Sequence, residues 1–192
     1  PAQRKFVVTL GGEHTSVVGA VHAHCDTYQD LTVLHLDAHS DLRDTYAGSA
    51  WNHACAAARI LDFHDHIVQV GIRSQAAEEH EAIAAHGIEV IYADDVHTDP
   101  TWVDRVIQST RDNVYITLDC DVLDPAVMPA TGTPEPDGLT WRQLDTLFAR
   151  LCRERHVVGL DLCELAPIPG LHHPQFSVAK LLYRLLGRWA AA

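Results

Sequence analysis

Short apolar runs alternate along the chain with longer segments whose apolar residues recur at helical spacing. The apolar runs, rich in β-branched residues, predict strands at 5–10, 31–36, 66–72, 88–93, 113–119 and 156–162. The segments between them predict helices at about 15–25, 51–61, 75–86, 101–111, 140–154 and 176–187. In the helix predicted at 140–154, Thr140 is a candidate N-cap, and Leu144, Leu147 and Leu151 lie on one face.

This regular alternation predicts an α/β fold. Strands separated by helices form a mainly parallel sheet that helices cover on both faces, so we expect a three-layer α/β/α architecture. No linker, internal repeat or low-complexity tract divides the sequence, and we expect residues 1–192 to form a single domain. A Pro- and Gly-rich segment at 125–138 directly follows a predicted strand, and loops of this length in compact domains are usually functional.

The composition narrows the range of partners and locations. With 192 residues, 47% of them hydrophobic, the chain can form a packed core. A formal net charge of -12 argues against binding to nucleic acid or to an anionic membrane surface. We find no apolar run near the ~20 residues of a membrane span and no secretory leader. The 5 cysteines lack a paired spacing, which favours reduced thiols and a cytoplasmic protein.

Acidic and histidine residues collect just after the predicted strands. In the stretch LTVLHLDAHSDLRD, Asp37, His39 and Asp41 occupy alternate positions after an apolar run. Alternate residues of an extended segment point to the same side, so these three side chains are expected to lie together. The same reasoning applies to Asp119 and Asp121 in ITLDCD.

These strand ends are expected to meet in one crevice, because ligands bind open α/β sheets outside the carboxyl ends of the strands. His14 follows the first predicted strand in TLGGEH, and Asp161 and Glu164 follow the last in GLDLCE. The side chains that suit a metal are His14, Asp37, His39, Asp41, Asp119 and Asp121. Carboxylates gathered in a crevice repel one another and lose hydration, and a pair of divalent cations would balance their charge.

The ligand types indicate which metal and which chemistry to expect. Carboxylates and imidazoles without thiolates suit Mn(II) or a similar divalent ion, and two such ions ~3.5–4 Å apart can activate water near neutral pH. A lone Asp at a strand end is more often a helix cap, but D-x-H-x-D together with D-x-D after two apolar strands is far more specific. His53 begins a predicted helix, and two interpretations stay open for it, a packed or capping histidine and a site residue.

The motifs GGEH, HLDAHSDLRD, NHA, VGIRS, LDCDVLDPAVMPATGTPEPDGLT and GLDLCELAP resemble the ureohydrolase (arginase/agmatinase) family over nearly the whole chain. The TGTPEPDGL segment looks like agmatinases in particular. The resemblance implies an arginase/deacetylase-like fold with two Mn(2+) ions per chain. Relatives usually carry a further region before GGEH, so we expect the chain to correspond to the C-terminal portion of a typical family member, incomplete at its N-terminus.

The same resemblance implies a role for each site residue. One ion would be held by His14, Asp37, Asp41 and Asp119. The other would be held by Asp37, His39, Asp119 and Asp121, with Asp37 and Asp119 bridging. Asp41 would also accept a hydrogen bond from the nucleophile, His53 would shuttle protons or contact the substrate, and Glu164 would grip the guanidinium.

The implied reaction is hydrolysis of a guanidino C–N bond to urea and an amine, in a homo-oligomer, a trimer or a hexamer. Agmatine, giving putrescine, is the leading substrate, because YAGSAWNHA does not reproduce the Ser/Asn motif with which arginases read the carboxylate of arginine. Alternative substrates are a guanidino acid, arginine and formimidoylglutamate. Two further alternatives are a mononuclear zinc amide hydrolase and a non-catalytic family member.

Overall fold

The computed structural model describes residues 5–192, and its centre is a sheet with the strand order β1-β6-β5-β2-β3-β4. The strands are β1 (Val7–Leu10), β2 (Leu31–Leu36), β3 (Ile67–Ile72), β4 (Glu89–Tyr92), β5 (Asn113–Asp119) and β6 (His156–Cys163). Each neighbouring pair is parallel. The prediction of a parallel sheet is therefore confirmed.

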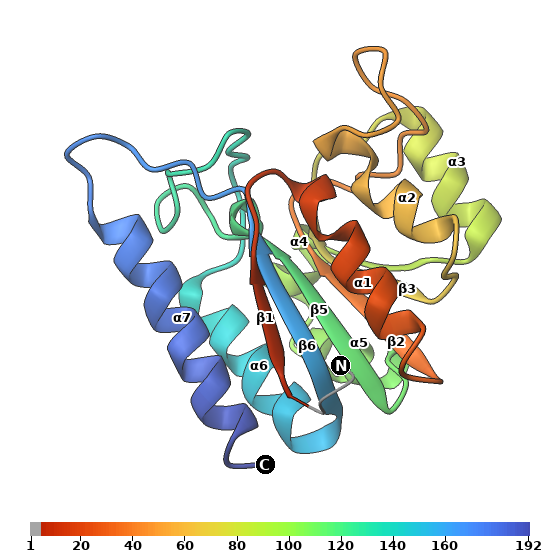
Figure 1. The fold of residues 1–192 in the computed structure, drawn as a ribbon. Helices are drawn as coiled ribbons and strands as arrows, with labels where there is room; N and C mark the ends of the chain where they lie inside the picture. The colour runs from red at the N-terminus through yellow and green to blue at the C-terminus, as the bar shows by residue number, and fades with distance from the viewer. Residues whose placement is uncertain (1–4) are drawn as a thin grey trace.

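Helices cover both faces of this sheet. They are α1 (Val18–Cys25), α2 (Ala56–Leu61), α3 (Ala77–His86), α4 (Ala93–Thr98), α5 (Trp102–Ser109), α6 (Trp141–Glu154) and α7 (His173–Trp189). Short 3₁₀ turns occupy His14–Val17, His53–Cys55 and Cys120–Val122. Helices α1, α2 and α3 lie on one face, and α5, α6 and α7 lie on the other (Figure 1). The three-layer α/β/α prediction is confirmed.

Alternation along the central strands builds a separate core on each face. In β2, Leu34 and Leu36 pack with α4 to α7, whereas Leu31 and Val33 pack with α1 to α3. On the α1 side the strand becomes polar toward its carboxyl end, where His35 follows Val33. This change turns one face of the sheet from apolar core into the floor of a polar site.

The strand order places that site at the middle of the sheet. The chain runs outward from β2 to β3 and β4, then returns to place β5 against the other side of β2. The direction of winding therefore reverses between β2 and β5, and α/β folds bind ligands at such a switch point. The acidic segments after β2 and β5 become neighbours because of this topology.

The structure differs from the sequence prediction at four helices. The segments predicted as helices at 15–25 and 51–61 each begin with a 3₁₀ turn, and α1 and α2 start at Val18 and Ala56. Residues Ala93–Thr98 form α4, which was not predicted because ADDVHT contains only two apolar residues and shows no helical periodicity. The start of α4 is capped by Asp95, whose Oδ2 accepts a hydrogen bond from Tyr92 N at 3.2 Å. Helix α7 begins at His173 rather than at 176, with Pro174 in its first turn, a position that tolerates a missing N–H. Among residues 5–192, no helix combines the length and the apolar character that crossing a bilayer requires.

Gly71, in a bulge of β3 beside the ligand-bearing segment, gives a test of this packing. It has φ +94°, and a Cβ there would lie 2.7 Å from Val122 Cγ2 and 3.1 Å from the Asp37 carbonyl oxygen. We expect Gly71→Ala to lower the free energy of unfolding by about 3 kcal/mol, from backbone strain and overpacking. Urea denaturation measures this change in the free energy of unfolding. Gly19→Ala in α1 is the control, since nothing lies within 4 Å of its added methyl group. Equal losses of stability in the two variants would contradict the close packing around Gly71.

Candidate metal centre

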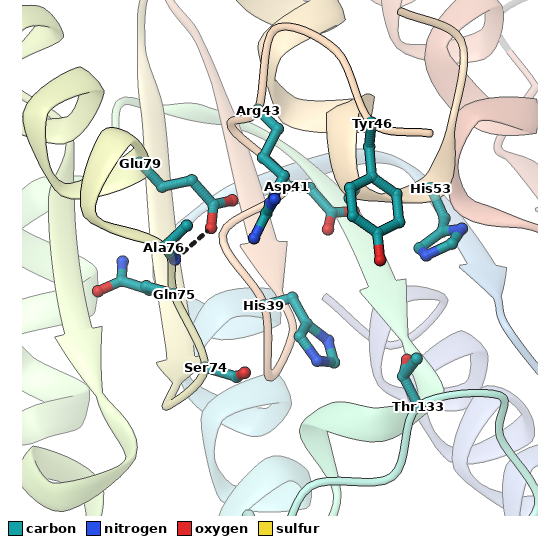
Figure 2. A pocket seen from close by; sticks show the side chains of 11 residues that line it. His39, Asp41, Arg43, Tyr46, His53, Ser74, Gln75, Ala76, Glu79 and Thr133 are labelled. Carbon is teal, nitrogen blue, oxygen red and sulfur yellow. Dashed lines mark hydrogen bonds between the residues drawn. The ribbon is translucent and has the colours of Figure 1, made fainter. Parts of the chain in front are cut away.

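A cavity of about 230 Å³ opens at the carboxyl ends of β2 and β3. Its lining includes the predicted site residues His39, Asp41 and His53 (Figure 2). Arg43 and Tyr46, which the sequence did not single out, also line it. Three predicted site residues from two separate motifs therefore share one cavity.

The loop that carries Asp41 is held in an uncommon conformation. Asp41 has φ +53°, in the left-handed region that non-glycine residues rarely occupy. Glu79 of α3 fixes the next residue, because its Oε1 accepts a hydrogen bond from Leu42 N at 3.0 Å and its Oε2 accepts one from Ala76 N at 2.7 Å. Strained backbone of this kind persists where the surroundings over-determine it and is typical of functional sites.

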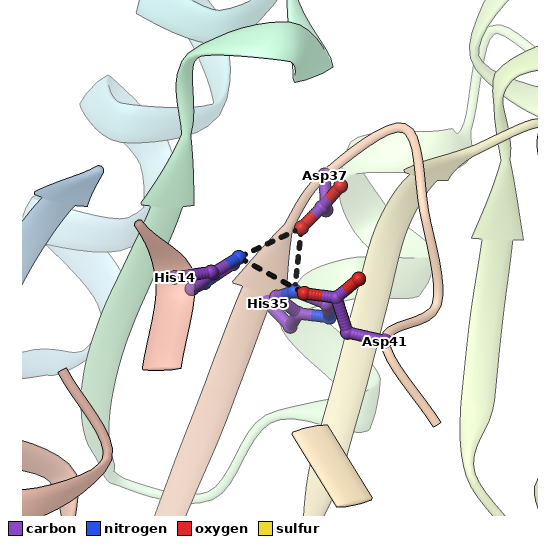
Figure 3. A group of neighbouring side chains, drawn as sticks. All are labelled: His14, His35, Asp37 and Asp41. Carbon is purple, nitrogen blue, oxygen red and sulfur yellow. Dashed lines mark hydrogen bonds and ion pairs between the residues drawn. The ribbon is translucent and has the colours of Figure 1, made fainter. Parts of the chain in front are cut away.

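Below the cavity, His14 is surrounded by carboxylates (Figure 3). Its Nδ1 lies 3.1 Å from Asp37 Oδ2, 3.2 Å from Asp41 Oδ2 and 3.5 Å from Asp119 Oδ2. The side chain is only 1% exposed, yet Nδ1 makes no well-formed hydrogen bond with any residue of the described chain. A buried nitrogen ringed by carboxylate oxygens but bonded to none of them fits a metal ion placed between these atoms.

A second group shares Asp37 with the first. His39 Nδ1 lies 3.0 Å from Asp121 Oδ2 and 3.5 Å from Asp37 Oδ1. Asp37 thus turns one carboxylate oxygen toward each group, which is the arrangement of a bridging ligand. Asp119 contacts the first group through His14, and its other oxygen accepts a hydrogen bond from Asp121 N at 2.8 Å.

The structure adds His35 to this cluster, a residue that the sequence reading missed. His35 Nε2 lies 2.9 Å from Asp37 Oδ2, and the ring is 2% exposed (Figure 3). A signal was present, because His35 is the only ionisable residue in the strand LTVLHL, whose other residues are apolar apart from Thr32. A polar residue in a strand that is buried on both faces needs a partner, and Asp37 is that partner.

Two residues, His53 and Glu164, are expected to contact the substrate. His53 is half-buried in the cavity, with its ring 5.8 Å from that of Tyr46. Glu164 follows β6 with φ +61°, and its Oε1 accepts a hydrogen bond from His14 N at 2.8 Å. Burial raises the pKa of Glu164, whereas the charge of His53 is among those that lower it. Glu164 therefore adjoins the first group but is outside the lining of this cavity.

The charges of the cluster are compensated by protons in the absence of a cation. Burial lowers the pKa of His39, but its hydrogen bonds to Asp121 and Asp37 outweigh burial and raise the pKa to about 11. Burial and the charge of Asp37 raise the pKa of Asp41 to about 6 and also raise the pKa values of Asp119 and Asp121. Protons and cations thus compete for the same sites.

This fold and this cluster define a class: α/β proteins that carry a His- and Asp-rich candidate metal centre at the carboxyl edge of a parallel sheet. The sequence model of the arginase family matches residues 2–187. The chain belongs to the arginase family, and the resemblance to ureohydrolases that its motifs indicated is confirmed.

Three relatives show the extent of the similarity. The N(1)-aminopropylagmatine ureohydrolase of Synechocystis sp. is 42% identical over 187 residues, which cover 96% of this chain and 61% of that protein. The agmatine ureohydrolase structure from Thermoplasma volcanium has a TM-score of 0.86 and 36% identity, over 97% of this chain and 63% of that one. An arginase structure from Bacillus cereus, 24% identical, shares the fold with a TM-score of 0.84, over 97% of this chain and 72% of that one. The chain thus spans 61% and 63% of the first two relatives.

Metal binding should release protons. A metal ligand must be deprotonated, and His39, with a pKa of about 11, carries a proton at neutral pH. Raising the pH from about 6 to about 8 should therefore strengthen Mn(II) binding, by about tenfold per pH unit for each proton released. Calorimetric titrations in two buffers of different ionisation enthalpy count these protons. A binding enthalpy that does not depend on the buffer would contradict this account of the cluster.

Proposed function

We propose that the chain is a binuclear manganese amidinohydrolase that cleaves a guanidino C–N bond to urea and an amine. The observation that carries the proposal is the pair of His and Asp groups that share Asp37 beneath a cavity. One group consists of His14, His35, Asp37 and Asp41 and the other of Asp37, His39 and Asp121, and in each the candidate ligand atoms lie within 4.8 Å of one another. Asp119 is outside both groups, with its Oδ2 3.5 Å from His14 Nδ1. His14, Asp37, Asp41 and Asp119 would hold one ion, and Asp37, His39, Asp119 and Asp121 would hold the other.

The residues present fit these ions. Hard carboxylate oxygens and imidazole nitrogens without thiolate suit Mn(II), and the unbonded Nδ1 of His14 points to a ligand role. Bound as a pair, such ions lower the pKa of water and so supply a nucleophile at neutral pH. A guanidinium needs this help, because its delocalised charge makes it a poor electrophile.

The chain's own residues would orient the substrate and move the proton. Glu164 would hold the guanidinium through charge-assisted hydrogen bonds, which a carboxylate forms with a planar fork of N–H donors. His53, half-buried at the cavity wall, would deliver a proton to the departing amine nitrogen, as a histidine acting as general acid does. Asp41, which lines the same cavity, would accept a hydrogen bond from the attacking water.

Substitution of His53 tests the proton-transfer role. We expect His53→Asn to lower kcat by on the order of 100-fold, because general acid catalysis contributes at least that much, while Mn(II) affinity stays unchanged. Urea release from agmatine under saturating Mn(II) measures it. His86→Asn, an exposed histidine at the end of α3, is the matched control. Equal rates for the two variants would remove His53 from the mechanism.

Agmatine, giving putrescine, is the leading substrate. Two relatives, an agmatine ureohydrolase and an N(1)-aminopropylagmatine ureohydrolase, support a guanidino compound whose far end is an amine. One observation favours a second candidate, a guanidino acid. Arg43 lines the cavity, with its guanidinium 5.0 Å over the Tyr46 ring and 3.6 Å from Glu78. An arginine in this place would attract a carboxylate and repel a terminal ammonium.

Comparing agmatine with 4-guanidinobutyrate in native protein and Arg43→Gln separates these substrates. If agmatine is the substrate, the native chain should prefer it, and Arg43→Gln should leave kcat/KM for agmatine unchanged or raised. If the acid is the substrate, Arg43→Gln should lower its kcat/KM by about tenfold, the value of one charge-assisted hydrogen bond. Absence of urea from both compounds, from aminopropylagmatine and from arginine, together with absence of formamide from formimidoylglutamate, would refute the proposed hydrolysis.

Metal content separates the remaining alternatives. Two ions per chain favour the binuclear centre, whereas one zinc ion would favour an amide hydrolase of the deacetylase type. Tight Mn(II) binding without turnover would favour a non-catalytic member. A homo-oligomer, trimer or hexamer, and a cytoplasmic location belong to the same proposal, and light scattering of the purified chain measures its assembly.

A further inference from the structure

We propose that a row of four buried polar residues, one from each of four adjacent strands, positions the ligands of the metal centre. The row consists of Gln69, His35, Thr117 and Asp161, and we call it the polar row. The inference rests on the proposed metal centre and assigns roles to residues outside its ligand set.

The register of the sheet places these residues side by side. Gln69 of β3 pairs with His35 of β2, His35 pairs with Thr117 of β5, and Thr117 pairs with Asp161 of β6. Each is at most 2% exposed. Asp37 and Asp119 come two residues after His35 and Thr117 in the chain, so the row lies directly beneath the carboxylates.

One half of the row fixes Asp37. The Gln69 side-chain amide donates to Ser40 O at 2.8 Å, which identifies that atom as nitrogen, and its second N–H donates to His35 Nδ1 at 3.0 Å. Because Nδ1 accepts, Nε2 carries the proton of a neutral His35 and donates to Asp37 Oδ2 at 2.9 Å. Gln69 thereby holds both the carboxylate and the backbone between His39 and Asp41.

The other half fixes His14. The Thr117 hydroxyl donates its single proton to Asp161 Oδ1 at 2.9 Å, so it can only accept from His14 Nε2, also at 2.9 Å. This contact places one imidazole proton on Nε2, so that Nδ1 is the nitrogen that a neutral His14 turns, unprotonated, toward a cation held among the carboxylates. A buried partner of this kind orients a histidine ligand and raises its basicity.

Ordinary core packing does not explain the row. Four adjacent buried positions filled by valine or leucine would satisfy the sheet, whereas buried polar side chains stabilise a fold only when their hydrogen bonds are complete. In this row Gln69 Oε1 and Asp161 Oδ2 have no hydrogen-bond partner within the described chain. The row therefore carries a desolvation cost, which a role in ordering the ligands explains.

Titration with Mn(II), followed by electron paramagnetic resonance, tests the row without measuring activity. We expect Thr117→Val, which keeps the shape and removes the hydroxyl, to weaken binding by about 10- to 100-fold, and Thr117→Ser to restore it. Gln69→Leu should weaken binding by a similar factor through His35. Thr32→Val is the matched control: Thr32 is equally buried in β2, and its hydroxyl accepts a hydrogen bond from Arg111 N at 2.8 Å, away from the cluster. The Thr32→Val variant should be less stable than the native protein but should bind Mn(II) with the native affinity.

The tautomer of His35 gives a second readout that needs no substitution. In the Zn(II)-loaded native chain, long-range ¹H–¹⁵N spectra should show the His35 proton on Nε2 and a bare Nδ1. A proton on Nδ1, or unchanged Mn(II) affinity in both Thr117→Val and Gln69→Leu, would overturn the polar row while leaving the metal centre standing. Failure of the native chain to bind Mn(II) would instead overturn the centre and the row together.

Discussion

Repulsion among buried carboxylates is the constraint on which the rest of the structure depends. Asp37, Asp41, Asp119 and Asp121 are each at most 5% exposed at the ends of adjacent strands. Such a group cannot stay ionised without compensating positive charge. The sheet order that joins β2 to β5 brings these carboxylates together. The histidines around them and the raised pKa values of Asp41, Asp119 and Asp121 accommodate the charge.

The surrounding loops are tied down in a way that serves the same purpose. Arg73, just after β3, donates to the carbonyl oxygens of Asp121, Glu135 and Pro136 at 2.7, 2.8 and 2.9 Å. The loop at 125–138 is thereby fastened to the ligand segment after β5, and Thr133 of this loop reaches Asp121 Oδ2 at 3.3 Å. The long loop is part of the scaffold that keeps the second group of ligands in place.

The strands could be predicted from the sequence, and so could the grouping of Asp37, His39 and Asp41, because both are local patterns. Apolar runs mark buried strands, and D-x-H-x-D directly after such a run places its side chains together. The polar row could not be predicted, because pairing Gln69 with His35 and Thr117 with Asp161 depends on the register between strands distant in the chain. The place of Arg43 in the cavity likewise depends on the path of a loop, and α4 is too short for a periodic pattern.

Anomalous diffraction from crystals of the chain loaded with Mn(II) tests the central claim most directly. Two anomalous peaks are predicted on either side of Asp37, one against His14 Nδ1 and one against His39 Nδ1, ~3.5–4 Å apart. A single peak, or manganese bound only away from these residues, would contradict the account. The buried carboxylates would then lie together without the two cations that are proposed to balance their charge.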